Sequence, residues 1–119
     1  MDFALTEEQT AIFDMAHAFG QDNIAPHAQQ WERDGTIPKE LWPQIAELGF
    51  GGLYVSEDGG GSGLSRLDAT LVFEALSMAC PSVAAFLSIH NMCAKMIDTF
   101  ASDEMKARVM PDVLSMKTV

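Results

Sequence analysis

The stretch YVSEDGGGSGLSRLD, residues 54–68, contains the residue types whose spacing best suits ligand chemistry, because glycine-rich loops that lead into helices often bind phosphate. The dinucleotide fingerprint needs glycines at i, i+2 and i+5, and Gly59 and Gly61 fit, but position 64 is leucine. A P-loop needs Gly-Lys-Ser/Thr, whereas the nearest basic residue here is Arg66. Glu57 and Asp58 precede the glycines and would repel a phosphate. We therefore predict a structural hinge, at which glycine permits positive φ angles.

Other side chains capable of chemistry are scattered along the chain. The histidines lack metal-ligand spacing with one another or with a cysteine; they are His17, His27 and His90. His90 lies on an apolar helix, which favours a core histidine with satisfied hydrogen bonds over one that lines a pocket. Glu74, in the apolar run VFEALS, could be a general base, but a buried glutamate paired with a helix end or an amide is favoured. These residues predict neither a catalytic site nor a metal site.

The composition indicates the kind of protein that positions these residues. The chain of 119 residues suggests one domain, and 48% hydrophobic residues suffice for a core. A net charge of −10 argues against nucleic acid and anionic membrane surfaces as partners. Two cysteines without a CxxC motif favour free intracellular thiols. Residues 75–94 carry no charge and could span a bilayer, but Pro81 and several polar residues interrupt them. We predict two buried helices that meet at Pro81, and no membrane insertion.

Helix signals recur along the whole chain. The first helix is predicted to end or kink at Pro26, with one or two further turns before Gly35. The next is predicted to open at residues 37–38, to have a first turn distorted by Pro43, and to end at Gly49. The segment FGGLYV that follows is predicted to be extended. Two capping boxes mark helix starts: Thr6 with Gln9, and Ser65 with Asp68.

Three more helices follow the glycine-rich stretch. Those predicted over residues 66–79 and 83–100 are apolar nearly all round, which predicts burial. Ser102 caps a final helix that Pro111 is predicted to interrupt before one more apolar turn. The sequence therefore predicts an all-α fold, a helical bundle of about five to six helices in one domain, residues 1–119.

Four segments occur in the order seen in the acyl-CoA dehydrogenase family. They are LTEEQ, WERDGTIPKELWPQIAELGFGGLYVSEDGGGSG, FEALS and SDEMKARVMPDVLS. Each alone is weak, but the ordered set is specific, and the chain resembles that family's N-terminal domain from Phe3 to about Thr118. The stretch LSIHNMCAKMID is most similar to the isobutyryl-CoA dehydrogenase branch, with the 2-methylbutyryl and short-chain branches next. The family's N-terminal domain is all α-helical, in agreement with the helices predicted above.

The resemblance implies α,β-dehydrogenation of an acyl-CoA. In the family a glutamate removes the α-proton, the β-hydrogen leaves as hydride to FAD, and an electron-transferring flavoprotein reoxidises the flavin. The family's middle β-domain, with its flavin segment, and its C-terminal helical domain, with the base, have no counterpart in these residues. The resemblance thus implies no catalytic or cofactor-binding residue in this chain, and the 119 residues alone are not expected to hold FAD. A homo-oligomer is also expected.

The resemblance also implies that the domain supplies one wall of the acyl pocket, at the start of the fourth helix. Five residues occupy that region and are the predicted substrate-binding residues: Ala84, Ala85, Phe86, Leu87 and Ser88. Small side chains there would admit a branched acyl group, and Phe86 could limit chain length. Core packing is the competing interpretation, because apolar periodicity marks both a core and a pocket.

The cellular context depends on the source of the chain. The acidic start is neither a signal nor a transit peptide, so we expect the cytoplasm for a bacterial protein and the mitochondrial matrix for a processed eukaryotic one. The chain is interpreted as a fragment of a longer enzyme. A self-contained acidic helical module for interaction or regulation is the alternative. A flavin-binding segment after Val119 would support the enzyme, and a stop codon there would support the module.

Overall fold

Six α-helices and one short 3₁₀ helix make up the regular structure of the chain. The computed structural model describes residues 1–119 and contains no β-strand. The prediction of an all-α fold with about five to six helices is confirmed. In chain order the elements are α1 (Glu7–Asn23), α2 (Ala28–Asp34), α3 (Leu41–Glu47), the 3₁₀ helix η1 (Phe50–Gly52), α4 (Arg66–Ser77), α5 (Pro81–Phe100) and α6 (Asp103–Leu114).

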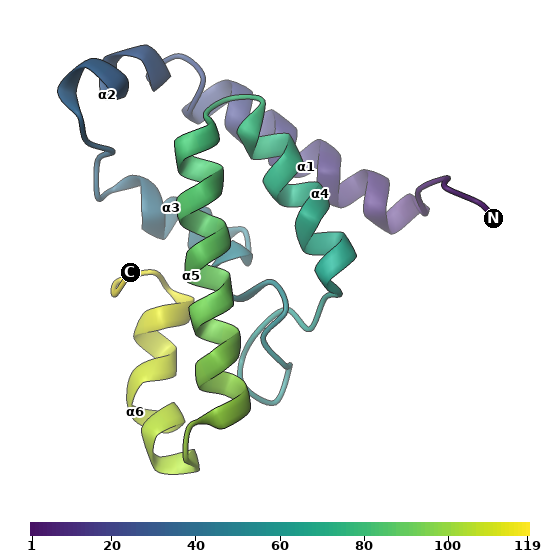
Figure 1. Ribbon diagram of the computed structural model, residues 1–119, viewed down its shortest axis with the longest axis vertical. Coiled ribbons are helices and arrows are strands. Elements are labelled where there is room, and N and C mark those ends of the chain that lie inside the picture. Colours follow the sequence, from purple (N-terminus) through teal and green to yellow (C-terminus); the bar gives the residue numbers. More distant parts are fainter.

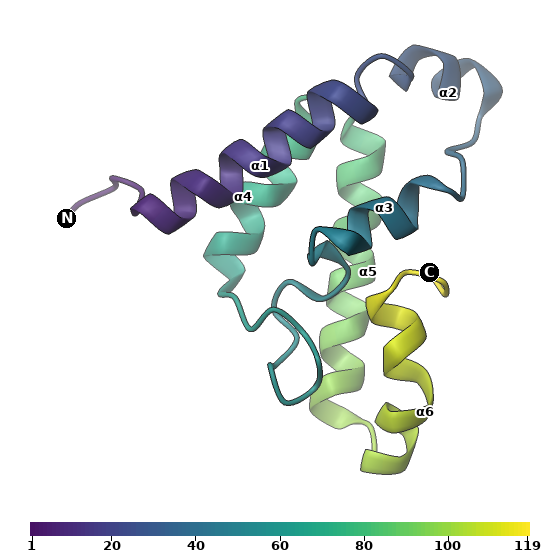
Figure 2. The ribbon, with the colours of Figure 1, turned by 180° about the vertical axis from the view of Figure 1, so that it is seen from behind.

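Both predicted capping boxes are present, and a hydrogen bond joins them. The side chains of Thr6 and Gln9 each accept a hydrogen bond from the other residue's backbone N–H, and Ser65 and Asp68 do the same at α4. The Gln9 side-chain amide also donates to the Asp68 carboxylate at 3.1 Å. This bond, together with those from Ser65, lowers the pKa of Asp68. The first turns of α1 and α4 are thereby tied together, and the two helices lie side by side (Figures 1 and 2).

Most helix ends lie where the sequence places them. α1 ends at Asn23, and Pro26 lies in the turn before α2. α2 stops at Gly35, whose φ of 70° is a left-handed conformation that glycine adopts without strain. Pro81 occupies the first turn of α5, where its missing N–H costs nothing. Residues 75–94 therefore belong to two helices that meet at this proline, as predicted.

The segment around α3 differs from the prediction. α3 begins at Leu41 rather than at residues 37–38, so Pro43 falls in the first turn, where its missing N–H has no intrahelical partner to lose. The predicted extended conformation of FGGLYV is wrong, because residues 50–52 form η1 and turns follow. An extended segment would need a neighbouring strand for its backbone groups, and this all-α chain offers none.

The last helix passes through its proline. α6 continues from Asp103 to Leu114 with Pro111 inside it, so the predicted interruption is wrong. Proline removes only its own N–H, and its carbonyl still accepts a hydrogen bond from the Ser115 N–H at 3.1 Å. The predicted apolar turn is present, and beyond it Met116 is buried at 2% exposure.

α5 occupies the centre of the molecule. It packs against α4 on one side and against η1 and α6 on the other (Figure 1). The main core lies among α1, α3, α4, α5 and the η1 segment. Its fully buried side chains include Ile45, Leu53, Leu76 and Leu87. This core fixes the orientation of α5, and hence which residues of α5 remain exposed.

The molecule is flat, with extents of 43 × 41 × 19 Å. A helix with its side chains is about 10–12 Å wide, so the short dimension accommodates at most two layers of helices. The burial predicted for the helices over residues 66–79 and 83–100 is therefore wrong for one face of each. Leu67 on α4 is 61% exposed, and Ile89 and Phe100 on α5 are 56% and 81% exposed.

Candidate functional site

A hollow of about 490 Å³ lies along the exposed face of α5, in its first half. Most of its wall is apolar; the lining residues are Ser82, Ala85, Phe86, Ile89, His90, Cys93 and Val119. The hollow contains no carboxylate side chain and no side-chain cation. A lining of this kind suits contact with an apolar group.

The structure divides the five predicted substrate-binding residues between two faces of α5. Ala84 and Leu87 are 5% and 0% exposed and belong to the main core. Ala85 and Phe86 face the hollow and are exposed. Ser88 is half-buried, and its hydroxyl donates to the Ala85 carbonyl of its own helix at 2.8 Å. Their role in substrate binding stays a prediction, and within the chain only Ala85 and Phe86 line an open space.

The ring of Phe86 packs against that of Trp42, a residue that sequence reasoning did not connect with the predicted site. The rings of Phe86 and Trp42 stack with centroids 4.3 Å apart and an angle of 23° between their planes. Trp42 comes from α3 and is 5% exposed. No local signal could have revealed this pair, because its members are 44 residues apart in the sequence.

His90 lies at the edge of the hollow, and its ring is bonded to the fold. Its Nε2 is 2.9 Å from the Val113 carbonyl and donates to it, and the residue is 8% exposed. Burial lowers the pKa of His90, and contacts with the backbone of Val113 and Gly51 oppose this effect. The imidazole is therefore neutral near pH 7. The prediction of a buried histidine with a satisfied hydrogen bond is confirmed, although the same residue also lines the hollow.

Asn91, next to His90, secures η1 to α5. Its side-chain oxygen accepts from the Leu53 N–H at 2.7 Å, and its amide donates to the carbonyls of Phe50 and Leu87 at 2.9 and 3.0 Å. It is completely buried. Sequence reasoning treated Asn91 only as a polar interruption, although a polar side chain within a buried apolar run needs such partners.

The glycine-rich stretch is a packed turn and not an open cradle. The N–H groups of Gly59, Gly60 and Gly61 donate to carbonyls of residues 56 and 57, and that of Gly63 donates to the Val55 carbonyl. Gly60 and Gly63 have φ angles of 91° and 64°, as a hinge of glycines permits. A phosphate would need free N–H groups, and these are already used within the turn.

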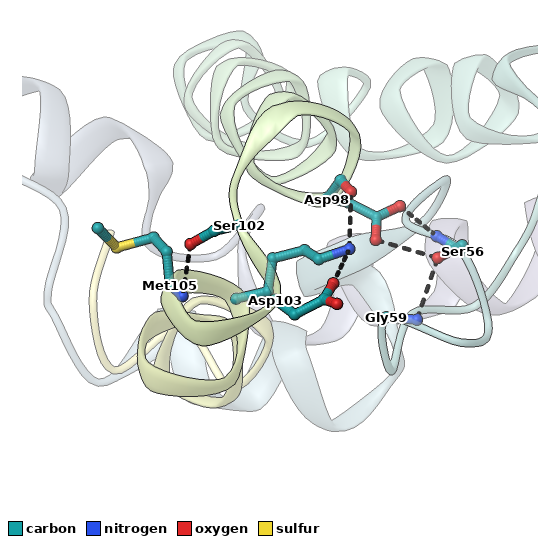
Figure 3. A network of polar contacts seen from close by, with 7 residues as sticks. Ser56, Gly59, Asp98, Ser102, Asp103 and Met105 are labelled. Atoms are coloured by element: carbon teal, nitrogen blue, oxygen red, sulfur yellow. Dashed lines mark hydrogen bonds and ion pairs between the residues drawn. The ribbon is translucent and has the colours of Figure 1, made fainter.

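A buried carboxylate at the end of α5 fixes this turn (Figure 3). Asp98 accepts hydrogen bonds from the N–H and the hydroxyl of Ser56, both at 3.0 Å, and its side chain is 6% exposed. The bond from the Ser56 N–H lowers the pKa of Asp98 and outweighs the opposing effect of burial. Lys95 and Lys106 lie nearby, with the Lys95 Nζ 3.8 Å from the carboxylate. The contact of Asp98 with Ser56, which we call the clasp, therefore has a structural role: it fastens the glycine turn to the end of α5.

The remaining candidate groups form no site. The prediction that Glu74 is buried is wrong, because this side of α4 faces solvent in so flat a molecule. Cys80 is a buried free thiol and Cys93 an exposed one. No group of three or more His, Cys, Asp or Glu side chains lies close enough to hold a metal ion. None of the helices has the length and apolar character that a bilayer-spanning segment requires.

Comparison with known proteins relates these features to one family. Residues 6–117 match the family described as acyl-CoA dehydrogenase, N-terminal domain. The chain is 46% identical over 115 residues to the mitochondrial isobutyryl-CoA dehydrogenase of Dictyostelium discoideum, covering 97% of this chain and 28% of that protein. The corresponding enzyme of Bos taurus is 43% identical over 113 residues, covering 95% of this chain and 27% of that protein.

The fold agrees with these sequence matches. The structure of butyryl-CoA dehydrogenase from Megasphaera elsdenii superposes with a TM-score of 0.88 at 31% identity, covering 100% of this chain and 32% of that one. The chain thus spans less than a third of the length of the relatives it matches. The matched region, the identities and the shared helical fold agree with one another, and the chain belongs to the acyl-CoA dehydrogenase family, in which it corresponds to the N-terminal helical domain.

Proposed function

We propose that the whole protein is an FAD-dependent acyl-CoA dehydrogenase that introduces an α,β double bond into a short, branched acyl-CoA. The observation that carries this proposal is the identity of 46% and 43% with two isobutyryl-CoA dehydrogenases over nearly the whole chain. A match of this extent favours the enzyme over a self-contained interaction module.

The contribution of this domain is one wall of the acyl pocket. The apolar hollow on α5 supports this role, because Ala85 and Phe86 both line it and Ala85 is small enough to leave room for a branch. Ala84 and Leu87 anchor the wall in the core, and the Ser88 hydroxyl donates to the Ala85 carbonyl of the same helix. Ile89 adds to the same surface, although the sequence analysis had not singled it out.

The flavin is held by other parts of the whole protein. The N–H groups of the glycine turn are occupied, and the hollow on α5 has no cationic side chain that could pair with a pyrophosphate. FAD bound by those other parts of the protein would accept the β-hydrogen as hydride. The residues of this chain would orient the acyl group and exclude water from it. We therefore expect the isolated 119 residues to purify without a flavin absorption band, and near-stoichiometric flavin would contradict this expectation.

The partners follow from the same proposal. They are the acyl-CoA substrate, an electron-transferring flavoprotein that accepts the electrons, and further copies of the same chain in a homo-oligomer. The two isobutyryl-CoA relatives are mitochondrial, which supports the mitochondrial matrix for a eukaryotic source and the bacterial cytoplasm otherwise.

Turnover of a substrate panel tests the proposed activity. The full-length protein, loaded with FAD and supplied with electron-transferring flavoprotein, would be assayed with isobutyryl-, 2-methylbutyryl-, butyryl- and hexanoyl-CoA. Because one misplaced methylene in an apolar pocket typically changes kcat/KM by about 10-fold or more, isobutyryl-CoA should exceed hexanoyl-CoA by at least about that factor. Equal or higher kcat/KM for hexanoyl-CoA would contradict the proposal.

A single variant tests whether this domain forms the wall. Phe86→Ala should raise kcat/KM for hexanoyl-CoA relative to isobutyryl-CoA, with unchanged flavin content. Phe100→Ala is the control, because this residue is 81% exposed on the same helix and does not line the hollow. If Phe86→Ala lowers the melting temperature but leaves the substrate profile unchanged, position 86 serves packing alone and the wall assignment is wrong.

A further inference from the structure

Trp42 is the residue behind the exposed ring of Phe86, and it belongs to a different helix. It comes from α3, is 5% exposed, and stacks on Phe86 with ring centroids 4.3 Å apart. We propose that Trp42 is a specificity-determining positioning residue, which sets the length of the acyl pocket by holding Phe86 in place. This inference rests on the proposed role of α5 as a wall of that pocket.

Phe86 lies between two hollows. The one of about 490 Å³ on the outer face of α5 is the proposed acyl wall. A second hollow of about 440 Å³ lies on the other side, among α2, α3 and the start of α5. Phe86 and Ser82 line both, and the walls of the second hollow include Trp31 and Trp42. In this proposal, the Phe86 ring is the partition that separates them.

The partition depends on Trp42 because Phe86 has little other support. Its side chain is 40% exposed, so solvent leaves other χ1 rotamers open to it. Trp42 is fixed by its burial in the main core beside Leu41 and Ile45. The stacked indole thus selects one orientation of the Phe86 ring. Without the indole, the ring is free to turn, and the two hollows join into one channel, whose inner part is lined by apolar residues together with Glu32, Thr36 and Ser82.

The consequence for the enzyme is a change in chain-length preference, not in chemistry. A joined channel has room for a longer straight acyl chain, whose end would occupy the second hollow. The short branched substrate uses only the first hollow, so its own kcat should change little. Trp42 contacts neither substrate nor flavin in this account and acts through Phe86 alone.

Four variants of the full-length, FAD-loaded enzyme test the proposal with isobutyryl-CoA and hexanoyl-CoA. They are Trp42→Leu, Trp42→Phe, Phe86→Ala and the double variant Trp42→Leu/Phe86→Ala. Trp42→Leu should raise the ratio of kcat/KM for hexanoyl-CoA over isobutyryl-CoA by about 10-fold, mainly through a lower KM for hexanoyl-CoA. Trp42→Phe retains a stacking ring and should keep the ratio close to that of the wild type. The double variant should show no larger shift than Phe86→Ala alone, because the partition is already gone.

Trp31→Leu is the matched control. Trp31 lines the second hollow but stacks on His27, with ring centroids 5.6 Å apart, and not on Phe86. Its substitution should leave the ratio unchanged. If Trp42→Leu fails to fold, Trp42→Met fills similar volume without a ring and should give the same shift.

The outcomes separate this inference from the proposed function. In one outcome, Phe86→Ala shifts the ratio, but Trp42→Leu (or Trp42→Met in its place) leaves it within about twofold of the wild type. The proposed role of Trp42 is then wrong, and the acyl wall stands. If Phe86→Ala produces no shift, the acyl wall itself is wrong. A shift in Trp42→Leu that simply adds to that of Phe86→Ala would show that Trp42 acts by another route, and would also overturn the inference.

Discussion

His90 is buried with its ring bonded to the Val113 carbonyl, and burial lowers its pKa. The unfolded chain binds a proton at this imidazole near the ordinary value of about 6.5, whereas the folded chain resists protonation. Stability contributed by neutral His90 is therefore complete above about pH 6.5 and is lost as the pH falls toward the lower folded pKa.

The corresponding prediction concerns the pH dependence of unfolding. The free energy of unfolding, measured by urea denaturation, should fall between pH 7.5 and pH 5, by at most about 1.4 kcal/mol per pH unit for one proton. The free energy of unfolding of His90→Gln, which has no titrating ring at this position, should fall less over this range. His27→Gln is the control, since His27 is exposed, and it should follow the wild type. Equal losses for His90→Gln and the wild type would contradict the assignment.

At the same scale, the sequence did not show which residues of the predicted acyl wall are exposed. The resemblance implied a wall at residues 84–88; of these, Ala85 and Phe86 line the hollow, and their contact with substrate stays a prediction. Which side chains face the hollow could not be predicted, because the helix is apolar nearly all round and its periodicity is weak. The partner of Phe86 was equally hidden, because Trp42 reaches it only through tertiary packing.

Among the elements, helix starts were easier to predict than the segments between them. Thr6, Ser65 and Ser102 all cap helices, because a hydroxyl next to free N–H groups is a local signal. The conformation of residues 50–55 was predicted wrongly because it depends on distant partners. Leu53 donates to Asn91, and Ser56 to Asp98, 38 and 42 residues away.

The clasp between α5 and the glycine turn yields an element-scale prediction. Asp98→Ala leaves the partly buried Ser56 N–H without its acceptor, which should cost about 1 kcal/mol in free energy of unfolding, the low end of the range for an unsatisfied buried group. Hydrogen exchange at Ser56 and Gly61 should become faster as the turn loosens. In the wild type, the stability due to Asp98 is present above about pH 4 and is lost as the pH falls through its lowered folded pKa.

Asp112→Ala provides the comparison for the clasp, since Asp112 is exposed on α6. This substitution should change stability by less than about 0.5 kcal/mol. Unchanged exchange at Ser56 and Gly61 in Asp98→Ala would show that the clasp does not hold the turn.

At the scale of the whole molecule, the flat shape exposes more solvent-accessible surface than a monomeric protein of this mass usually has. The accessible area is 7222 Å², compared with about 6300 Å² expected for a monomeric protein of 12.9 kDa. Part of it is an apolar stripe along α5, formed by Phe86, Ile89, Met92, Met96 and Phe100. A patch of this kind usually marks a contact with another part of a protein.

We predict that the isolated chain associates with itself through this stripe. Its net charge of −10 opposes association, so the effect should grow with protein concentration and with salt. Analytical ultracentrifugation in high salt should detect dimers or larger species. Ile89→Glu/Met96→Glu should remain monomeric, whereas Leu67→Glu, an exposed change on α4, should associate like the wild type. A strictly monomeric wild type at high concentration would count against this prediction.

The central claim is that this helical domain forms one wall of the acyl pocket, and photolabelling tests it most directly. A short acyl-CoA with a diazirine at the end of its acyl chain would be bound to the full-length, FAD-loaded protein and photolysed. Peptides would then be mapped after trypsin digestion. The account predicts an adduct within the peptide 67–95, at Ala85, Phe86 or Ile89, that excess isobutyryl-CoA suppresses. Competable labelling confined to peptides outside residues 1–119 would contradict the account.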